Sequence, residues 1–281
     1  MLYLFRKVKS CSKIHDFSFF PATFEIISRL FSTFYHQTFN LNSDILMKTK
    51  LVLFIFCVFS LIQTQVRADE QTRTVGAFTE ISLRVGAKVH LEQGEKQNLE
   101  IVAKPSKLEQ LITEVKDGKL IVRFPTKEVF WKTFQPGEIV IYITMPEING
   151  LNVSGSGDIL AENAIKSKII DLTLSGSGNI RLSELSAERV KTTTSGSGNV
   201  EVAGKSVAQD LSVVISGSGN FKGMDFSADD VSVKVSGSGN VEVEANKNLY
   251  VRVAGSGNVS YKGKALVDSS IAGSGRIKKV Q

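Results

Sequence analysis

The clearest pattern in the chain is an alternation of apolar and polar residues, interrupted at regular intervals by Ser-Gly-Ser-Gly-Asn. In residues 231–243 the odd positions are Val, Val, Val, Gly, Gly, Val and Val, and the even positions are Ser, Lys, Ser, Ser, Asn and Glu. Side chains of a β-strand alternate between its two faces. The pattern therefore predicts strands, with the apolar residues and both glycines on one buried face. No stretch with a helical period recurs.

The interruption occurs seven times from residue 154 on, with successive starts 21, 20, 21, 20, 18 and 18 residues apart. A nearly constant step of about 20 residues is typical of a solenoid. We interpret each copy as a coil corner, where glycine is needed because a Cβ has no room or because φ is positive. The predicted corner glycines are Gly155, Gly157, Gly176, Gly178, Gly196, Gly198, Gly217, Gly219, Gly237, Gly239, Gly255, Gly257, Gly273 and Gly275.

Short strands, tight polar corners and this step together predict an all-β fold, a parallel β-helix with about 20 residues per coil. Stacking repeats each corner in register, so every corner residue lies about 4.8 Å from its copy in the next coil. We therefore expect the corner asparagines to form a hydrogen-bonded ladder along the stack.

Residues 69–150, ahead of the repeats, also alternate in short runs such as Ile139–Met145. Asp117-Gly118 is a hairpin signal. The run Leu108–Val115 is compatible with either a short helix or a strand. We predict that this N-terminal β-rich region caps and begins the solenoid, and that residues 151–281 form the repeat β-helix.

Residues 125–137 break the alternation. The segment holds the single tryptophan of the chain, Trp131, between Phe130 and Phe134, and it is bounded by prolines. One interpretation is a cap over an open end of the solenoid, which terminal repeats require. The other is an aromatic platform that binds a sugar or another partner. Both interpretations stay open at the level of sequence.

The N-terminal residues suggest export. Residues 1–46 are rich in phenylalanine and show no regular period, while Met47–Lys50 is basic and precedes the apolar run 51–62 and the small residue Ala68. This order is that of a secretory signal peptide. The run is shorter than the about 20 residues that span a membrane. We predict a signal peptide at 47–68, with 1–46 as an upstream extension of the reading frame or a disordered leader.

The positions of the cysteines and the net charge give further information about the class of protein. The two cysteines, Cys11 and Cys57, both precede residue 69, and Phe56 stands where a lipid-attachment site has a small residue. The remainder uses no disulfide. Residues 1–68 contain eight of the 34 basic and three of the 28 acidic residues, which leaves 26 and 25 and a net charge of +1. This balance gives no basic face for nucleic acid.

These features together resemble a known family. Phe78-x-x-Ile81, Gly86, Gln93-Gly94, a strand ending at Pro146 and the recurring corner from Val153 are similar to the family described as "Putative auto-transporter adhesin, head GIN domain", common in Bacteroidetes-type bacteria. The resemblance extends from about residue 74 to residue 279. It implies a right-handed parallel β-helix and an exported location, and it brings no active-site residues with it.

Enzymes built on β-helices use clustered carboxylates as metal ligands or as an acid–base pair. The last residue of the corner, which recurs on the outer face, is a carboxylate only in the first copy. Its seven occupants are Asp158, Asn179, Asn199, Asn220, Asn240, Asn258 and Arg276. His90, the sole histidine after residue 68, has no cysteine partner for zinc. The Gly-Ser-Gly motif matches neither a phosphate loop nor a nucleophile elbow. We predict no catalytic, metal or cofactor site.

The expected function is therefore that of a non-enzymatic, adhesin-like protein of the periplasm, cell surface or medium. Its elongated face would bind a glycan or a surface protein, but not nucleic acid, and the chain would hold no integral membrane domain after signal cleavage. Two alternatives stay open: a polysaccharide-processing β-helix enzyme and a purely structural periplasmic protein. The best candidates for partner binding are Phe130, Trp131 and Phe134.

Overall fold

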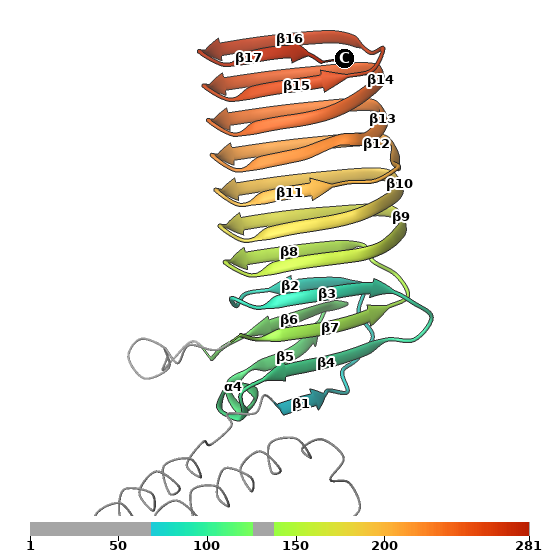
Figure 1. The fold of residues 1–281 in the computed structure, drawn as a ribbon, viewed down its shortest axis with the longest axis vertical. Helices are drawn as coiled ribbons and strands as arrows, with labels where there is room; N and C mark the ends of the chain where they lie inside the picture. Colours follow the sequence, from blue (N-terminus) through green and yellow to red (C-terminus); the bar gives the residue numbers. More distant parts are fainter. Residues whose placement is uncertain (1–68, 126–137, 281) are drawn as a thin grey trace, which may run out of the picture. The chain divides into compact units, whose positions relative to one another are not determined.

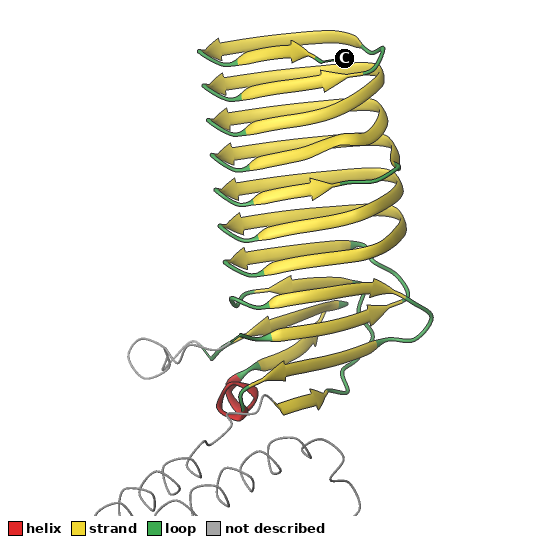
Figure 2. Cartoon of the chain, viewed as in Figure 1, coloured by secondary structure: helices red, strands yellow, loops and turns green. Residues whose placement is uncertain are grey.

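The computed structural model describes residues 69–125 and 138–280. The predicted leader (1–46), the predicted signal peptide (47–68) and the aromatic residues Phe130, Trp131 and Phe134 lie outside the described residues. Where the structure describes the chain, it is almost entirely β-strand (Figure 2).

The N-terminal region contains seven strands and one short helix within the described residues. Their bounds are β1 (Asp69–Thr72), β2 (Glu80–Leu83), β3 (Lys88–Gln93), β4 (Asn98–Ala103), α4 (Pro105–Gln110), β5 (Ile112–Lys116), β6 (Lys119–Arg123) and β7 (Val140–Met145). The ambiguous run after Lys107 divides, because α4 ends at Gln110 and β5 begins at Ile112. β5 and β6 form the predicted hairpin, and both Asp117 and Gly118 have positive φ, as a tight two-residue turn requires.

The repeats form a right-handed solenoid of parallel coils (Figure 1). The strands are β8 (Gly150–Gly155), β9 (Asp158–Gly176), β10 (Asn179–Gly196), β11 (Asn199–Val202), β12 (Ser206–Gly217), β13 (Asn220–Gly237), β14 (Asn240–Gly255), β15 (Asn258–Lys262), β16 (Leu266–Gly273) and β17 (Arg276–Lys279). Successive corners are in register, with Gly176 paired to Gly155 and Gly196 to Gly176. The predicted parallel β-helix is confirmed.

The N-terminal strands continue into the stack. β2 pairs in parallel with β8, and β3 pairs in parallel with β9. At the other side of these coils, β4 pairs with β1 and β7 in antiparallel fashion. The guanidinium of Arg73, which follows β1, donates to the carbonyls of Leu108 and Leu111 at 2.6 and 2.5 Å. Burial lowers the pKa of this Arg73 side chain. These contacts cover the first coils with α4 and β1.

The core is a column of aliphatic side chains inside the coils, and the alternating pattern places it correctly. Leu172 and Leu174 are fully buried and lie in register with Thr192 and Thr194 of the next coil. Both threonine hydroxyls are buried, and neither has a hydrogen-bond partner among the residues that the structure describes. The shape of threonine, which is close to that of valine, fits the aliphatic column, although its hydroxyl loses hydration there.

The two corner glycines differ in their roles, which corrects the prediction that both face the core. The first glycine of each copy has φ between +128° and +131° and lies at the exposed or half-exposed bend. The second is buried in six of the seven copies and does not have positive φ. From the second copy on, a Cβ on either glycine would collide with the carbonyl of its counterpart one coil earlier, at 2.5 Å in the case of Gly219 and Gly198. The bend shifts the first glycine out of the alternation, which the linear pattern does not record.

The expected asparagine ladder is confirmed. Each amide nitrogen donates to the side-chain oxygen one coil earlier: Asn179 to Asp158 at 2.7 Å, Asn199 to Asn179 at 3.0 Å, Asn220 to Asn199 at 2.8 Å, Asn240 to Asn220 at 2.9 Å and Asn258 to Asn240 at 3.0 Å. All the amides point the same way because the carboxylate of Asp158 can only accept. Arg276 occupies the next register position after Asn258, at the end where the amide oxygens point. The terminal charges thus match the alignment of the amide dipoles.

Candidate functional site

One outward-facing row of side chains runs along the stack through neighbouring strands. It contains Tyr142 and His90, which are in register, with Glu100 beside Tyr142 on one side and Leu160 beside His90 on the other. Further along, the row carries charges of alternating sign, in the order Arg181, Glu201, Lys222 and Glu242. Most of this face is therefore a solvated charged surface, whose exposed ion pairs contribute little stability. The part of the row between Glu100 and Arg181 differs, because two rings and an aliphatic side chain replace the charges.

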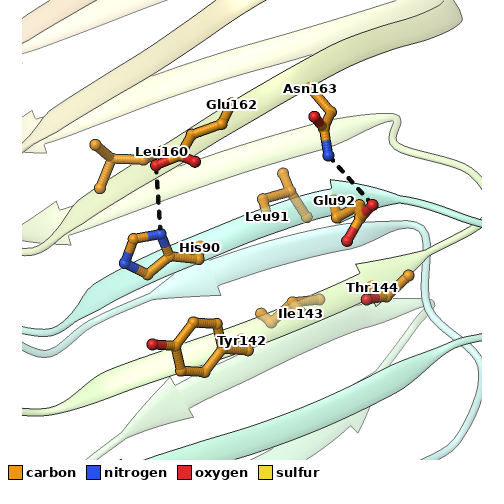
Figure 3. Close-up of a pocket in the computed structure, with 9 residues that line it drawn as sticks. All are labelled: His90, Leu91, Glu92, Tyr142, Ile143, Thr144, Leu160, Glu162 and Asn163. Carbon is orange, nitrogen blue, oxygen red and sulfur yellow. Dashed lines mark hydrogen bonds and ion pairs between the residues drawn. The ribbon is translucent and has the colours of Figure 1, made fainter.

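The surface is hollowed at this point. β3 pairs with β7 along its whole length, but its pairing with β9 ends at His90 and Leu160. Beyond that point β9 diverges from β3 and leaves an open depression of about 220 Å³ (Figure 3). The lining residues are His90, Leu91, Glu92, Tyr142, Ile143, Thr144, Leu160, Glu162 and Asn163.

His90 and Tyr142 form the aromatic part of the depression. Their ring centroids lie 5.2 Å apart and their planes differ by 18°, so the rings are stacked with an offset. Figure 3 shows both rings with their faces, rather than their edges, toward the viewer. Tyr142 is 44% exposed although tyrosine is a large amphipathic residue that is often packed. The pair thus presents an exposed aromatic surface held on two hydrogen-bonded strands.

Glu92, Glu162 and Asn163 form the polar part. The amide of Asn163 donates to a Glu92 carboxylate oxygen at 3.2 Å, and a Glu162 oxygen lies 4.0 Å from Nδ1 of His90. The side chain of Glu162 is 79% exposed. None of the nine lining residues is a lysine or an arginine. The depression therefore combines aromatic faces with hydrogen-bond acceptors and an excess of negative charge.

Gln93 holds the wall in place. Its amide nitrogen donates to the carbonyls of Pro146 and Lys166, at 3.0 and 2.9 Å, and its oxygen accepts from the backbone N–H of Lys166 at 2.8 Å. These bonds tie the diverging part of β9 to the end of β3. The depression is consequently built on strands fixed from several sides, which favours a preformed site.

Sequence patterns did not predict that His90 and Tyr142 would line a common depression. In the sequence, His90 was considered only as a zinc ligand. The described residues contain no group of three or more His, Cys, Asp or Glu that could hold a metal ion. Tyr142 carried no signal beyond its outward position in an alternating strand. The two residues are about fifty positions apart, so their juxtaposition depends on strand pairing that the linear pattern does not specify. The predicted aromatic site at Phe130, Trp131 and Phe134 lies outside the described residues.

Other charged groups on the solenoid have structural partners. Lys262 lies 3.2 Å from Asp225 and 3.2 Å from Glu244, and hydrogen bonds to these carboxylates raise the pKa of the lysine. Lys247 lies 3.0 Å from Asp229, whose hydrogen bond likewise raises the pKa of Lys247. These ion pairs link side chains of different coils.

The stacked parallel coils of the described residues define a β-solenoid protein, with a depression on one outer face. The chain belongs to the family described as "Putative auto-transporter adhesin, head GIN domain", whose model matches residues 77–265. In the described part of the chain, no helix is long and apolar enough to cross a membrane.

Solved structures share the fold. A putative adhesin from Bacteroides fragilis NCTC 9343 is 24% identical over 78% of this chain and 100% of its own, with a TM-score of 0.69. A putative lipid binding protein from Parabacteroides distasonis ATCC 8503 is 24% identical over 76% of this chain and 97% of its own, with a TM-score of 0.59. A putative adhesin from Parabacteroides merdae ATCC 43184 is 17% identical over 76% and 97%, with a TM-score of 0.61. A search of curated proteins found no match.

Proposed function

We propose that this protein is an exported, non-enzymatic adhesin-like protein that binds a glycan or a surface protein through the outer face of its solenoid. The observation that carries the proposal is the exposed aromatic depression around His90 and Tyr142. Convergent aromatic and polar groups in a preformed hollow are the usual features of a binding site. Membership of an adhesin-like family and the signal peptide predicted at 47–68 support the exported location.

Binding at the depression is testable by removal of one ring. Tyr142→Ala removes the exposed ring without disturbing the core, because the side chain faces outward. We expect it to weaken binding to immobilised glycans or peptides by about tenfold or more, the loss typical of an aromatic anchor. The measurement is titration of the labelled protein against an array that carries neutral glycans, anionic glycans and peptides.

Tyr250→Ala is the matched control. Tyr250 is 49% exposed, close to the value for Tyr142, and it lies on β14, away from the depression. The Tyr250→Ala variant should bind the same probes with an affinity within about twofold of that of the wild type. If both substitutions weaken binding equally, or if neither does, the depression is not the binding site.

One specific observation favours the enzymatic alternative. Glu92 and Glu162 line the same depression, and glycoside hydrolysis uses two carboxylates. The array glycans should therefore also be assayed for cleavage. Loss of cleavage in both Glu92→Gln and Glu162→Gln would establish the enzyme, whereas binding without any cleavage agrees with the adhesin-like function. A purely structural protein would bind none of the probes.

A further inference from the structure

We propose that the depression binds a cationic side chain, the guanidinium of arginine or the ammonium of lysine, from a basic segment of a protein partner. This inference rests on the proposed function, because it assigns a chemical class of partner to the same depression. Three properties of the depression support it: its aromatic faces, its unbalanced charge and its size.

The aromatic faces suit a cation. A guanidinium or ammonium group placed over a tyrosine ring is attracted by the negative face of the ring. Tyr142 presents such a face beside His90, and its ring is 44% exposed. Glu100 lies in register with Tyr142 on the strand opposite His90, which adds a third acidic residue next to the rings.

The second property is the unbalanced charge of the lining, which contains two glutamates and neither a lysine nor an arginine. Several outward carboxylates elsewhere have basic partners, as in Glu80 with Lys119 at 2.8 Å, Glu201 with Arg181 at 3.7 Å and Glu244 with Lys262 at 3.2 Å. Among the described residues, neither Glu92 nor Glu162 has a lysine or arginine within ion-pair distance. Their polar contacts are with Asn163 and His90.

A cationic partner would supply the missing charge. Carboxylates form strong charge-assisted hydrogen bonds with guanidinium groups, and these bonds add geometric specificity. A hollow lined by one sign of charge also attracts ligands of the opposite sign during association. By the same reasoning, anionic glycans and phosphates should be excluded, because their charge would meet that of Glu92 and Glu162.

The size favours one side chain over an oligosaccharide. The depression measures about 220 Å³, below the range of roughly 300–1,000 Å³ that is typical of small-molecule pockets. An arginine or lysine side chain with its aliphatic stem fits a hollow of this volume. Leu160 lies at its edge and offers an aliphatic contact for such a stem.

The test uses a synthetic peptide of alternating arginine and glycine, labelled for fluorescence anisotropy. The probe control is the same peptide with citrulline, a neutral analogue of nearly equal shape, in place of arginine. We expect the arginine peptide to bind at least about tenfold more tightly than the citrulline peptide. Raising the salt from about 50 to about 300 mM should weaken the arginine peptide several-fold, because screening reduces exposed charge interactions.

The protein variants locate the effect. The double substitution Glu92→Gln with Glu162→Gln removes both charges at nearly constant shape, and it should weaken the arginine peptide by about tenfold or more. Glu201→Gln, on the same face but beside Arg181, is the matched control and should change affinity by less than about twofold. All three positions face outward, so unchanged circular dichroism is expected for each variant.

The outcomes separate this inference from the proposed function. Equal binding of the arginine and citrulline peptides would contradict the proposal that the depression binds a cationic side chain. An unchanged affinity of the double variant for the arginine peptide would contradict it as well. If a neutral glycan then binds in a Tyr142-dependent and salt-independent manner, the adhesin-like function is supported and only the assignment of a cationic partner is wrong. If Tyr142→Ala changes the binding of no probe, both the proposed binding at the depression and its cationic partner are contradicted.

Discussion

At the scale of single residues, the corner glycines are the positions that most strictly require their amino acid. The first glycine of each copy has a φ that residues with a Cβ rarely adopt, and the second lies against the backbone of the preceding coil. Gly155 and Gly176 separate the two causes, because both have φ +128°. A Cβ on Gly155 would meet no atom within 4 Å, whereas a Cβ on Gly176 would overlap the carbonyl of Gly155.

We therefore expect Gly155→Ala to cost only the conformational strain, about 1–3 kcal/mol. Gly176→Ala should cost clearly more, because the strain is the same and the coil spacing must also increase. Urea denaturation followed by circular dichroism measures both free energies of unfolding. Equal losses for the two variants would show that close approach between coils contributes nothing at this corner.

At the scale of elements, the asparagine ladder links successive coils at the corner. Asn220 is at its centre: it donates to Asn199, and its oxygen accepts from both the side chain and the backbone N–H of Asn240, the latter at 3.1 Å. Asn258, near the end, donates to Asn240 at 3.0 Å. Asparagines at equivalent positions of two corners thus make different numbers of hydrogen bonds.

Asn220→Ala should accordingly destabilise the protein by about 1–3 kcal/mol, since its three hydrogen bonds are lost and the amide of Asn240 loses an acceptor. Asn258→Ala loses a single exposed bond and should cost less than about 1 kcal/mol. The shift of the thermal unfolding midpoint ranks the two variants. A larger shift for Asn258→Ala would contradict the ladder as a source of stability.

At the scale of the whole solenoid, burial differs between the first and the last described coils. α4 and β1 cover the first coils, where Leu99 and Ile101 are fully buried. In the last coil every residue of β16 is exposed, although its apolar residues keep the alternating positions that point into the core in earlier coils. Val253 and Val267 show the contrast, since both follow the inward phase but are 3% and 40% exposed.

Val253→Ala should lower the free energy of unfolding by about 2 kcal/mol, because it removes two buried methyl groups and leaves a cavity. Val267→Ala should lower it by less than about 1 kcal/mol, since much of its side chain already contacts water. Chemical denaturation of the two variants in parallel provides the comparison. Equal losses would contradict the exposure of β16, and would indicate that the last coil is covered in solution.

The solenoid, the register of its coils, the hairpin at Asp117-Gly118 and the asparagine ladder could all be predicted from the amino-acid sequence. Each of these follows from local patterns, and sevenfold repetition of one corner leaves a single way to align the coils. Which glycine needs positive φ could not be predicted in this way, because the bend of the folded coil rotates the first glycine out of the strand alternation. The depression could not be predicted either. β3, β7 and β9 meet there from distant parts of the chain, and no periodic pattern records that β9 diverges from β3 after Leu160. Nor does such a pattern record that Glu92 and Glu162 have no lysine or arginine partner within the described residues.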